Sequence, residues 1–448
     1  MHDLLHDAAS RASAYLEGLA QRKVAPDTAA IDALVALEGQ LPDAPCEPRE
    51  VLDLLDRYGS PATMAMAGPR FFGFVIGGAL PVTVAANWLA TAWDQNAAMD
   101  RITPAATRLE QTALRWLVEL FGLPRESAGA FVTGATVANF VALAAARHRL
   151  LANVGWNVEA DGLFGAPPIT VVVGEEAHPS MIKSLGLLGL GRNRVVRVAA
   201  DGQGRMRVDA LPRTSGATII CAQVGNVNSG ASDAVDAIRE RAGADAWVHV
   251  DGAFGLWARV APSRAAQVQG LELADSWATD AHKWLNVPYD CGLAFVRDAN
   301  ALSAAMAITA EYLPTQTHGR NPSDYTPELS RRARGIDVWA ALRTLGRSGI
   351  SELIERNCRQ ARRFGEALSA NGFDVLNEIA LNQVVVALGD AARTQRFIAA
   401  LQAEGTCWCG VTVWRGRTAM RISVSSWATT DADVELSIAA MLRLAAET

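Results

Sequence analysis

The sequence has 448 residues, of which 50% are hydrophobic and 20% charged, and its formal net charge is −6. A chain of this length and composition can bury a substantial core, so extensive disorder is not expected. Because the net charge is negative and the basic residues are scattered, we expect neither a nucleic-acid-binding face nor a polybasic membrane surface. The expected partner is a small molecule.

The N-terminal segment, residues 1–20, has acidic and polar residues within an apolar periodicity, which predicts an amphipathic helix and not a signal peptide. We expect residues 1–60 to form a helical arm. The most apolar long window, residues 77–93, is interrupted by Pro81 and Asn87 and is shorter than the roughly 20 residues that a membrane-spanning helix needs. These features predict a soluble protein without a membrane anchor.

A turn from Thr133 to Thr136 opens an alanine-rich helical pattern within residues 129–150. Free backbone N–H groups at a helix start, with a hydroxyl beside them, can bind an anion. The helix dipole contributes only about 0.3–1 kcal/mol, whereas each hydrogen bond to a charged phosphate contributes roughly 1.5–3 kcal/mol. The Ala135 N–H and the Thr136 hydroxyl therefore matter more than the dipole. A threonine that only caps a helix would leave the same pattern.

Short β-branched runs alternate with helical stretches between residues 168 and 300, which predicts an α/β fold with a mostly parallel sheet covered on both faces. The runs are residues 168–173, 194–198, 217–224, 246–250 and 292–296.

The texture changes after residue 300, where a polar segment, residues 313–335, leads into a long helical pattern and then two strand-like runs, residues 384–388 and 420–424. We expect a large domain over residues 61–330 and a smaller C-terminal α+β domain over residues 331–448.

The six cysteines are sparse for this length, so we expect reduced thiols in a cytoplasmic protein and not a disulfide framework. The pair Cys407 and Cys409 has a single-residue spacing and no second cluster beside it, which favours packing over a zinc site. No metal is expected.

Three side chains follow strand-like runs, where an α/β sheet binds ligands. They are His178, Asp251 and Lys283. A capping role for Asp251 and a structural role for His178 would fit equally well. Lys283 lies between His282 and Trp284 beside an apolar segment, and desolvation there would favour a neutral amine that can attack a carbonyl.

One cofactor suits all of these features. Pyridoxal 5′-phosphate needs a lysine that binds its aldehyde, a carboxylate at its ring nitrogen, a phosphate cradle and a planar group stacked on its ring. Lys283, Asp251, the turn at residues 133–136 and His178 would fill these four roles.

The sequence also contains the motif DAHKWLNVPYDCG (residues 280–292), with PRFFGF at 69–74, TPAATRLEQTALRWLVELFGLP at 103–124 and RRARGIDVWAALRTLG at 331–346. Through these motifs nearly the whole chain resembles the group II pyridoxal-phosphate-dependent amino-acid decarboxylases, relatives of the aromatic-amino-acid, glutamate and histidine enzymes. The resemblance implies a carboxy-lyase of the aspartate-aminotransferase fold (the type I PLP-dependent transferase fold), with a seven-stranded sheet. It also implies a homodimer with the active site at the interface, which converts an L-amino acid into its amine and CO2.

The resemblance further assigns roles to particular residues. It places the phosphate contacts on Ala135, Thr136, His282 and Asp280, the stacking ring on His178, the acid at the ring nitrogen on Asp251, the small residue under the ring on Ala253 and the covalent lysine on Lys283.

A mobile-loop tyrosine protonates Cα in the aromatic decarboxylases, and the resemblance assigns that role to Tyr325, beside Gly319, Pro322 and Ser323. A surface tyrosine would leave the same pattern. The resemblance also implies a substrate-carboxylate contact for Arg421. The side-chain pocket departs from the aromatic enzymes, because the matching positions are Phe74, Val75, Gly77, Asn96 and Ala98.

Other functions remain open at the level of sequence. An aminotransferase or a carbon–carbon lyase would use the same four residues, because the protein chooses which bond is broken. A non-catalytic protein could retain the fold.

Overall fold

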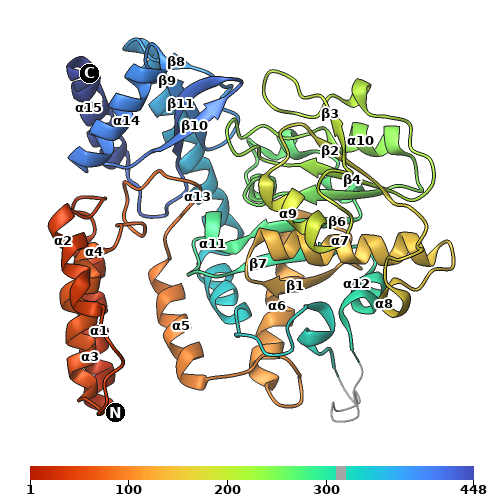
Figure 1. Ribbon diagram of the computed structural model, residues 1–448, viewed down its shortest axis with the longest axis horizontal. Coiled ribbons are helices and arrows are strands. Elements are labelled where there is room, and N and C mark those ends of the chain that lie inside the picture. The colour runs from red at the N-terminus through yellow and green to blue at the C-terminus, as the bar shows by residue number, and fades with distance from the viewer. Residues whose placement is uncertain (309–318) are drawn as a thin grey trace. The chain divides into compact units, whose positions relative to one another are not determined.

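The computed structural model describes residues 1–308 and 319–448, which divide into two compact units drawn in Figure 1. The large unit consists of residues 79–359 and 377–383, and the terminal unit consists of residues 1–78, 360–376 and 384–448. The domain division at residues 60 and 330 stays a prediction, because compactness does not show which parts fold independently.

The large unit contains a seven-stranded sheet with the order β1-β7-β6-β5-β4-β2-β3. Strand β7 runs antiparallel to both β1 and β6, and the other neighbouring pairs are parallel. The predicted α/β fold with a mostly parallel sheet is thereby confirmed. The strands are β1 (Ala128–Val132), β2 (Thr170–Gly174), β3 (Val196–Val198), β4 (Thr218–Gln223), β5 (Trp247–Asp251), β6 (Ser276–Asp280) and β7 (Gly292–Val296).

The side chains of β7 show which helix covers each face of the sheet. Ala294 and Val296 belong to the core that includes α7 (Ala135–Ala152), whereas Phe295 between them packs against Phe121 of α6 (Pro104–Phe121). Because successive strand residues point to opposite faces, α7 and α6 cover opposite faces of the sheet. The helix α7 is rich in buried alanines, whose small side chains let its backbone lie close to the strands.

Further helices complete the large unit, and two of them, α9 and α12, pack against α7. Among residues 1–308 and 319–448, no helix is long and apolar enough to cross a bilayer. The remaining helices are α5 (Pro81–Trp93), α8 (Val158–Asp161), α9 (Pro179–Leu187), α10 (Val235–Ala242), α11 (Ala281–Trp284) and α12 (Ala299–Met306).

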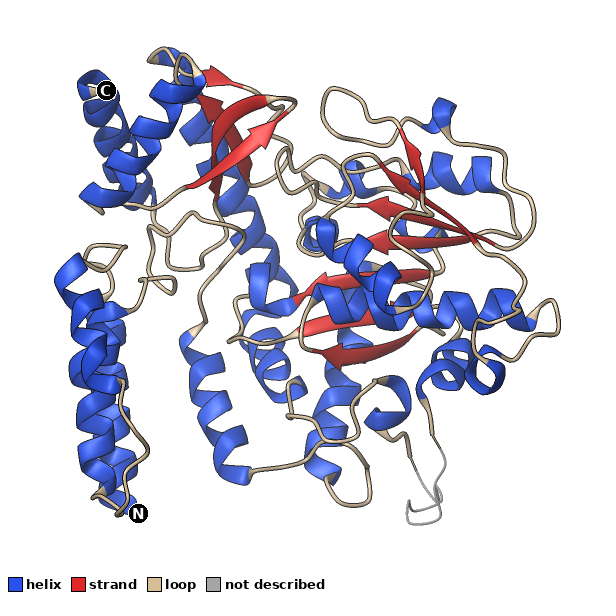
Figure 2. Cartoon of the chain, viewed as in Figure 1, coloured by secondary structure: helices blue, strands red, loops and turns tan. Residues whose placement is uncertain are grey.

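The terminal unit has helices at both ends of the chain and a four-stranded sheet with the order β10-β11-β9-β8 (Figure 2). The predicted helical N-terminus is confirmed by α1 (His2–Gly18), α2 (Thr28–Asp32), α3 (Pro48–Leu54) and α4 (Ser60–Ala62). The strands are β8 (Asp374–Val375), β9 (Gln383–Ala387), β10 (Gly410–Trp414) and β11 (Arg417–Ser423), and the later helices are α14 (Ala391–Glu404) and α15 (Asp431–Glu447).

The long helix α13 (Gly335–Ala370) belongs partly to each unit and is interrupted at Gly346, whose φ is 60°. A glycine is needed there because a side chain is strained at this positive φ.

Candidate active site

The residues predicted to hold the cofactor lie along one edge of the sheet of the large unit. Strands β1, β2, β5 and β6 point the same way, so their carboxyl ends meet at that edge. The residues that end these strands or follow them are the turn at 133–136, His178, Asp251 and the segment 280–283. The sheet topology therefore brings together side chains that are far apart in sequence.

The turn between β1 and α7 is open because of Gly134. A Cβ atom on this glycine would lie 3.3 Å from His282 Cε1 and 3.6 Å from Asp280 Oδ1. No side chain caps the start of α7, and the N–H groups of a first helical turn have no intrahelical acceptor. Backbone donors at Ala135 and Thr136 are therefore available to an anion at this point.

Lys283 lies on the short helix α11 and forms an ion pair with Asp280, with 3.0 Å between Lys283 Nζ and Asp280 Oδ2. The Asp280 side chain is only 3% exposed, and its other oxygen, Oδ1, has no hydrogen-bond partner among the described residues. A buried carboxylate oxygen without a partner is costly in a finished protein. This unpaired oxygen lies beside the open turn at Gly134.

His282 presents a hydrogen-bond donor to the same place. Its Nδ1 accepts the Cys291 N–H at 3.0 Å, its ring stacks on Tyr289 with centroids 4.3 Å apart, and its Nε2 lies 3.7 Å from Asp280 Oδ2. Burial lowers the pKa of His282, although the charge of Asp280 opposes this effect. A neutral ring whose Nδ1 is an acceptor carries its proton on Nε2.

Asp251, at the end of β5, is 5% exposed and uses both carboxylate oxygens. Oδ1 accepts the Ala253 N–H at 3.2 Å, and Oδ2 accepts an N–H of Asn139 at 3.1 Å. The carbonyl of Ala253 in turn accepts the Asp280 N–H at 2.9 Å. Asp251 therefore has the capping role that the sequence left open, and it is also held by a side chain of α7.

His178 is the N-cap of α9, where its Nδ1 accepts the Ser180 N–H at 3.2 Å. The helix α9 is joined to the start of α7, because the Ser184 hydroxyl donates to the Thr136 carbonyl at 2.8 Å. The structural role of His178 is thus present, and the same contacts place its ring at the edge that carries the turn.

Tyr325 does not meet Lys283 within one chain. It ends a short 3₁₀ helix (Pro322–Tyr325), where the guanidinium carbon of Arg320 lies 3.7 Å from its ring centroid. It shares a pocket with Gly129, near the N-terminal end of β1, whereas the turn follows the opposite end of that strand. Residues 313–318 of the polar segment lie outside the described residues.

The expected substrate-pocket residues are also placed. Asn96 holds the segment before α13, because its Oδ1 accepts the Arg331 N–H at 3.0 Å. Ala98 and Val75 are buried, and Phe74 is 58% exposed. Arg421 lies on β11 of the terminal unit, where burial lowers its pKa.

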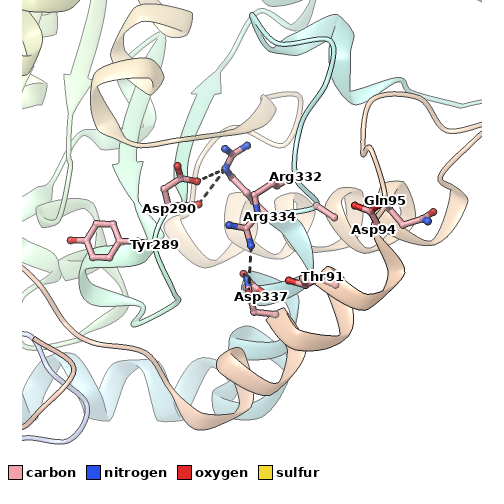
Figure 3. A pocket seen from close by; sticks show the side chains of 11 residues that line it. Thr91, Asp94, Gln95, Tyr289, Asp290, Arg332, Arg334 and Asp337 are labelled. Carbon is pink, nitrogen blue, oxygen red and sulfur yellow. Dashed lines mark hydrogen bonds and ion pairs between the residues drawn. The ribbon is translucent and has the colours of Figure 1, made fainter. Parts of the chain in front are cut away.

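A pocket of about 300 Å³ opens beside the loop that follows Lys283 (Figure 3). Tyr289, whose ring stacks on His282, lines it together with residues of α5 and of the start of α13. Arg334 Nε donates to Asp290 Oδ1 at 2.9 Å, and Asn87 Nδ2 donates to Asp337 Oδ2 at 2.8 Å.

Two buried residues beside Asp251, Asn139 and His249, were missed by the sequence analysis. His249 Nε2 lies 2.8 Å from Asn139 Oδ1, and both side chains are fully buried. Spacing could have identified them: His249 precedes Asp251 by two residues on the same face of β5, and Asn139 follows Thr136 by three residues on α7.

The chain is similar to known proteins in sequence and in fold. The pyridoxal-dependent decarboxylase conserved domain matches residues 37–388. An aromatic-L-amino-acid decarboxylase from Bacillus atrophaeus is 30% identical over 339 residues, which are 71% of this chain and 67% of that protein. An acidic amino acid decarboxylase from Bos taurus is 29% identical over 327 residues, 69% of this chain and 61% of that protein.

Among solved structures, the Oryza sativa TDC with PLP and tryptamine aligns with a TM-score of 0.91 at 23% identity and covers 100% of this chain and 97% of that one. This likeness concerns the fold.

Proposed function

The chain belongs to the pyridoxal-dependent decarboxylase family and is a pyridoxal-phosphate-dependent amino-acid decarboxylase, and from this premise we propose how its residues bind the cofactor and carry the reaction. The reaction converts an amino acid into its amine and CO2. The observation that supports the proposal is the convergence, at one sheet edge, of the Lys283 amine, the buried Asp251 carboxylate and the open turn at Gly134.

When bound, pyridoxal phosphate supplies an electron sink for the bond that breaks at Cα. In our proposal Lys283 Nζ is the amine that would hold the cofactor through its aldehyde. Asp251 would lie at the ring nitrogen and keep its proton there, which strengthens the sink, and N–H donors of Asn139 and Ala253 fix its two oxygens for this role.

The phosphate contacts are assigned to the start of α7 and to α11. The Ala135 and Thr136 N–H groups, the Thr136 hydroxyl and His282 Nε2–H are donors beside the open turn. This assignment also places Asp280 beside the phosphate. His178 would stack on one face of the cofactor ring, and the small side chain of Ala253 would lie under the other.

The test is incubation of the holoprotein with a panel of amino acids, with CO2 and amine measured by mass spectrometry. We expect both products in equal amounts from at least one amino acid. Keto-acid formation without CO2 would identify an aminotransferase, and aldehyde release from a β-hydroxy amino acid would identify a carbon–carbon lyase.

The Lys283→Ala variant is the matched control. We expect borohydride to trap a cofactor adduct on the wild-type chain and none on the variant, with turnover abolished in the variant. Full turnover by Lys283→Ala would rule out the assigned covalent lysine.

The protein is also proposed to act as a homodimer in the cytoplasm, with active sites at the subunit interface. Three large apolar side chains of α5 support the dimer because they are exposed: Trp88 by 44%, Leu89 by 55% and Trp93 by 46%. None of the six cysteines, all of which lie in the described part of the chain, forms a disulfide, which suits a reducing compartment.

A further inference from the structure

A line of buried polar side chains runs from Asp251 into the core between the sheet and α7. Asn139 Nδ2 donates to Asp251 Oδ2 at 3.1 Å, and Asn139 Oδ1 lies 2.8 Å from His249 Nε2. His249 Nδ1 lies 2.9 Å from the Ser276 hydroxyl, which accepts the Trp247 indole N–H at 2.8 Å. We call these four residues behind Asp251 the relay; each is at most 6% exposed.

The direction of every hydrogen bond in the relay follows from the charge on Asp251. An ionised carboxylate only accepts, so the Asn139 amide must present its NH₂ group to Asp251 and its oxygen to His249. His249 must then carry its proton on Nε2 and accept at Nδ1. The Ser276 hydroxyl can donate to that nitrogen, and the Trp247 N–H fills the acceptor position of the Ser276 oxygen.

A protonated Asp251 would reverse this order at a cost. Asp251 could then donate to the Asn139 oxygen, the amide would donate to His249 Nε2, and His249 Nδ1–H would donate to Ser276. The Ser276 hydroxyl proton would lose its acceptor, since residues 1–308 and 319–448 offer it no bond besides those to Trp247 and His249. A buried donor without an acceptor is unfavourable, so the relay favours the ionised carboxylate.

The titratable neighbours do not upset this pattern. Burial lowers the pKa of His249 to about 3, so the ring stays neutral at any pH at which the protein works. Cys221, which pairs with His249 in the register of β4 and β5, has its pKa raised by burial and by the charge of Asp251, so it remains a thiol.

We propose that Asn139, His249 and Ser276 are positioning residues that keep Asp251 ionised and thereby raise the proton affinity of the cofactor's ring nitrogen. None of them needs to touch the cofactor, because they act through Asp251. The inference rests on the proposed function, specifically on the role of Asp251.

The test is Ser276→Ala in the holoprotein reconstituted with pyridoxal phosphate that is isotopically labelled at its ring nitrogen. The nitrogen NMR shift is followed against pH. Without the Ser276 hydroxyl, each direction of the relay leaves His249 Nδ1 without its partner, so the cost that set the two directions apart, the unpaired Ser276 proton, is removed. We expect the ring nitrogen to lose its proton about one pH unit lower than in the wild type, a roughly tenfold fall in proton affinity.

Two controls separate this effect from ordinary damage to the core. Trp247→Phe removes a donor that fits either direction, so the titration should be unchanged although the packing is disturbed. Ser276→Thr keeps the hydroxyl and should restore the wild-type titration. If Ser276→Ala does not fold, Asn139→Ala tests the relay one residue nearer to Asp251. We expect it to lower the pH at which the ring nitrogen loses its proton by at least as much.

The outcomes distinguish this inference from the proposed function. If Asp251→Asn shifts the titration but Ser276→Ala and Asn139→Ala leave it at the wild-type value, the relay is overturned and the role of Asp251 stands. If Trp247→Phe shifts it as much as Ser276→Ala, the directional argument is wrong. If borohydride traps no cofactor on the wild-type chain, the proposed function itself fails.

Discussion

Asp280 places a negative charge where the proposed cofactor phosphate would lie. Its Oδ2 pairs with Lys283, but its buried Oδ1 has no partner among the described residues and faces the open turn at Gly134. A carboxylate beside a phosphate is repulsive, and this repulsion is screened little by solvent in a buried site.

We therefore expect Asp280→Asn, which keeps the size and removes the charge, to bind pyridoxal phosphate roughly tenfold more tightly, or by about 1.4 kcal/mol. Titration of the apoprotein, followed by cofactor absorbance, measures this affinity. Asp290→Asn changes a more exposed carboxylate in the loop that follows Lys283 and should have no such effect. Weaker binding by Asp280→Asn would show that the ion pair with Lys283 matters more than the repulsion.

Within one chain Tyr325 lies near the opposite end of β1 from the turn, so its predicted role in protonating Cα depends on the proposed dimer. If it has this role, Tyr325→Phe should slow amine formation by about 100-fold or more and divert product to aldehyde and ammonia in air. Mass spectrometry of the products measures the ratio. Tyr312→Phe is the matched control, since both tyrosines lie between α12 and α13 in sequence. A diverted product in Tyr312→Phe alone would transfer the role to Tyr312.

The residues at strand ends were open to prediction because a parallel sheet gathers whatever follows its strands. Asp251 and Lys283 each follow a buried run, so their neighbourhood followed from topology. Asn139 and His249 were not predicted, because each is a single polar residue within an apolar run and forms no recognisable motif. Their spacing from Thr136 and Asp251 was a usable signal for each residue alone, but only the packing of α7 on β5 shows that the two side chains meet.

The helix α13 depends on one glycine. At Gly346 the φ is 60°, and a Cβ there would meet no atom within 4 Å, so the cost of a side chain comes from the backbone alone. We expect Gly346→Ala to lower the free energy of unfolding by about 1–3 kcal/mol, measured by denaturant titration. Gly18→Ala, at the end of α1, also meets no atom within 4 Å but has no positive φ, and it should cause no loss.

The contact between α5 and α13 should make stability depend on pH. Burial raises the pKa of Asp337 from an ordinary 3.8 to about 6, against the hydrogen bond from Asn87. The folded chain therefore binds this proton more tightly than the unfolded chain does. The stability that this group contributes is full below about pH 4 and is lost as the pH rises through 6.

Asp337→Asn keeps the oxygen that accepts from Asn87 and removes the buried charge. At pH 8 it should raise the free energy of unfolding by up to about 3 kcal/mol, and at pH 4 it should have no effect. Thermal unfolding at the two pH values measures the difference. Asp94→Asn is the control: Asp94 lines the same pocket but is exposed, so this change should alter stability equally at both pH values. If Asp337→Asn raised the free energy of unfolding equally at both pH values, the argument from a buried charge would be contradicted.

The strands rich in β-branched residues were predicted correctly from the sequence. All five predicted runs between residues 168 and 300 coincide with strands, as do the two runs predicted near the C-terminus. The strand β1 was not predicted, because AGAFV contains two alanines and a glycine, and β6 was recognised only as a short run before Lys283. The strand β1 forms through pairing with β7, and sequence periodicity does not carry information about a partner so far along the chain.

At the scale of the whole molecule, the exposed apolar residues of α5 are where we place the proposed dimer interface. Monomers rarely expose a large contiguous apolar patch. We expect wild-type protein to be a dimer in light scattering and the double variant Trp88→Ser, Trp93→Ser to be a monomer with reduced decarboxylation. Phe164→Ser removes an aromatic that is 99% exposed elsewhere and should leave the dimer intact. A double variant that stays dimeric would place the interface on another surface.

The reversed direction of β7 has a consequence for how the lysine becomes positioned during folding. Because β7 returns beside β6, with Asp280 opposite Gly292, the loop of residues 281–291 is closed by a hairpin and not by a crossover. Pairing that is local in sequence costs little chain entropy and forms quickly, whereas parallel strands must wait for distant segments to meet. Lys283 thus belongs to a locally assembled substructure, whose geometry can be established before the strands that supply Asp251 and His178 arrive.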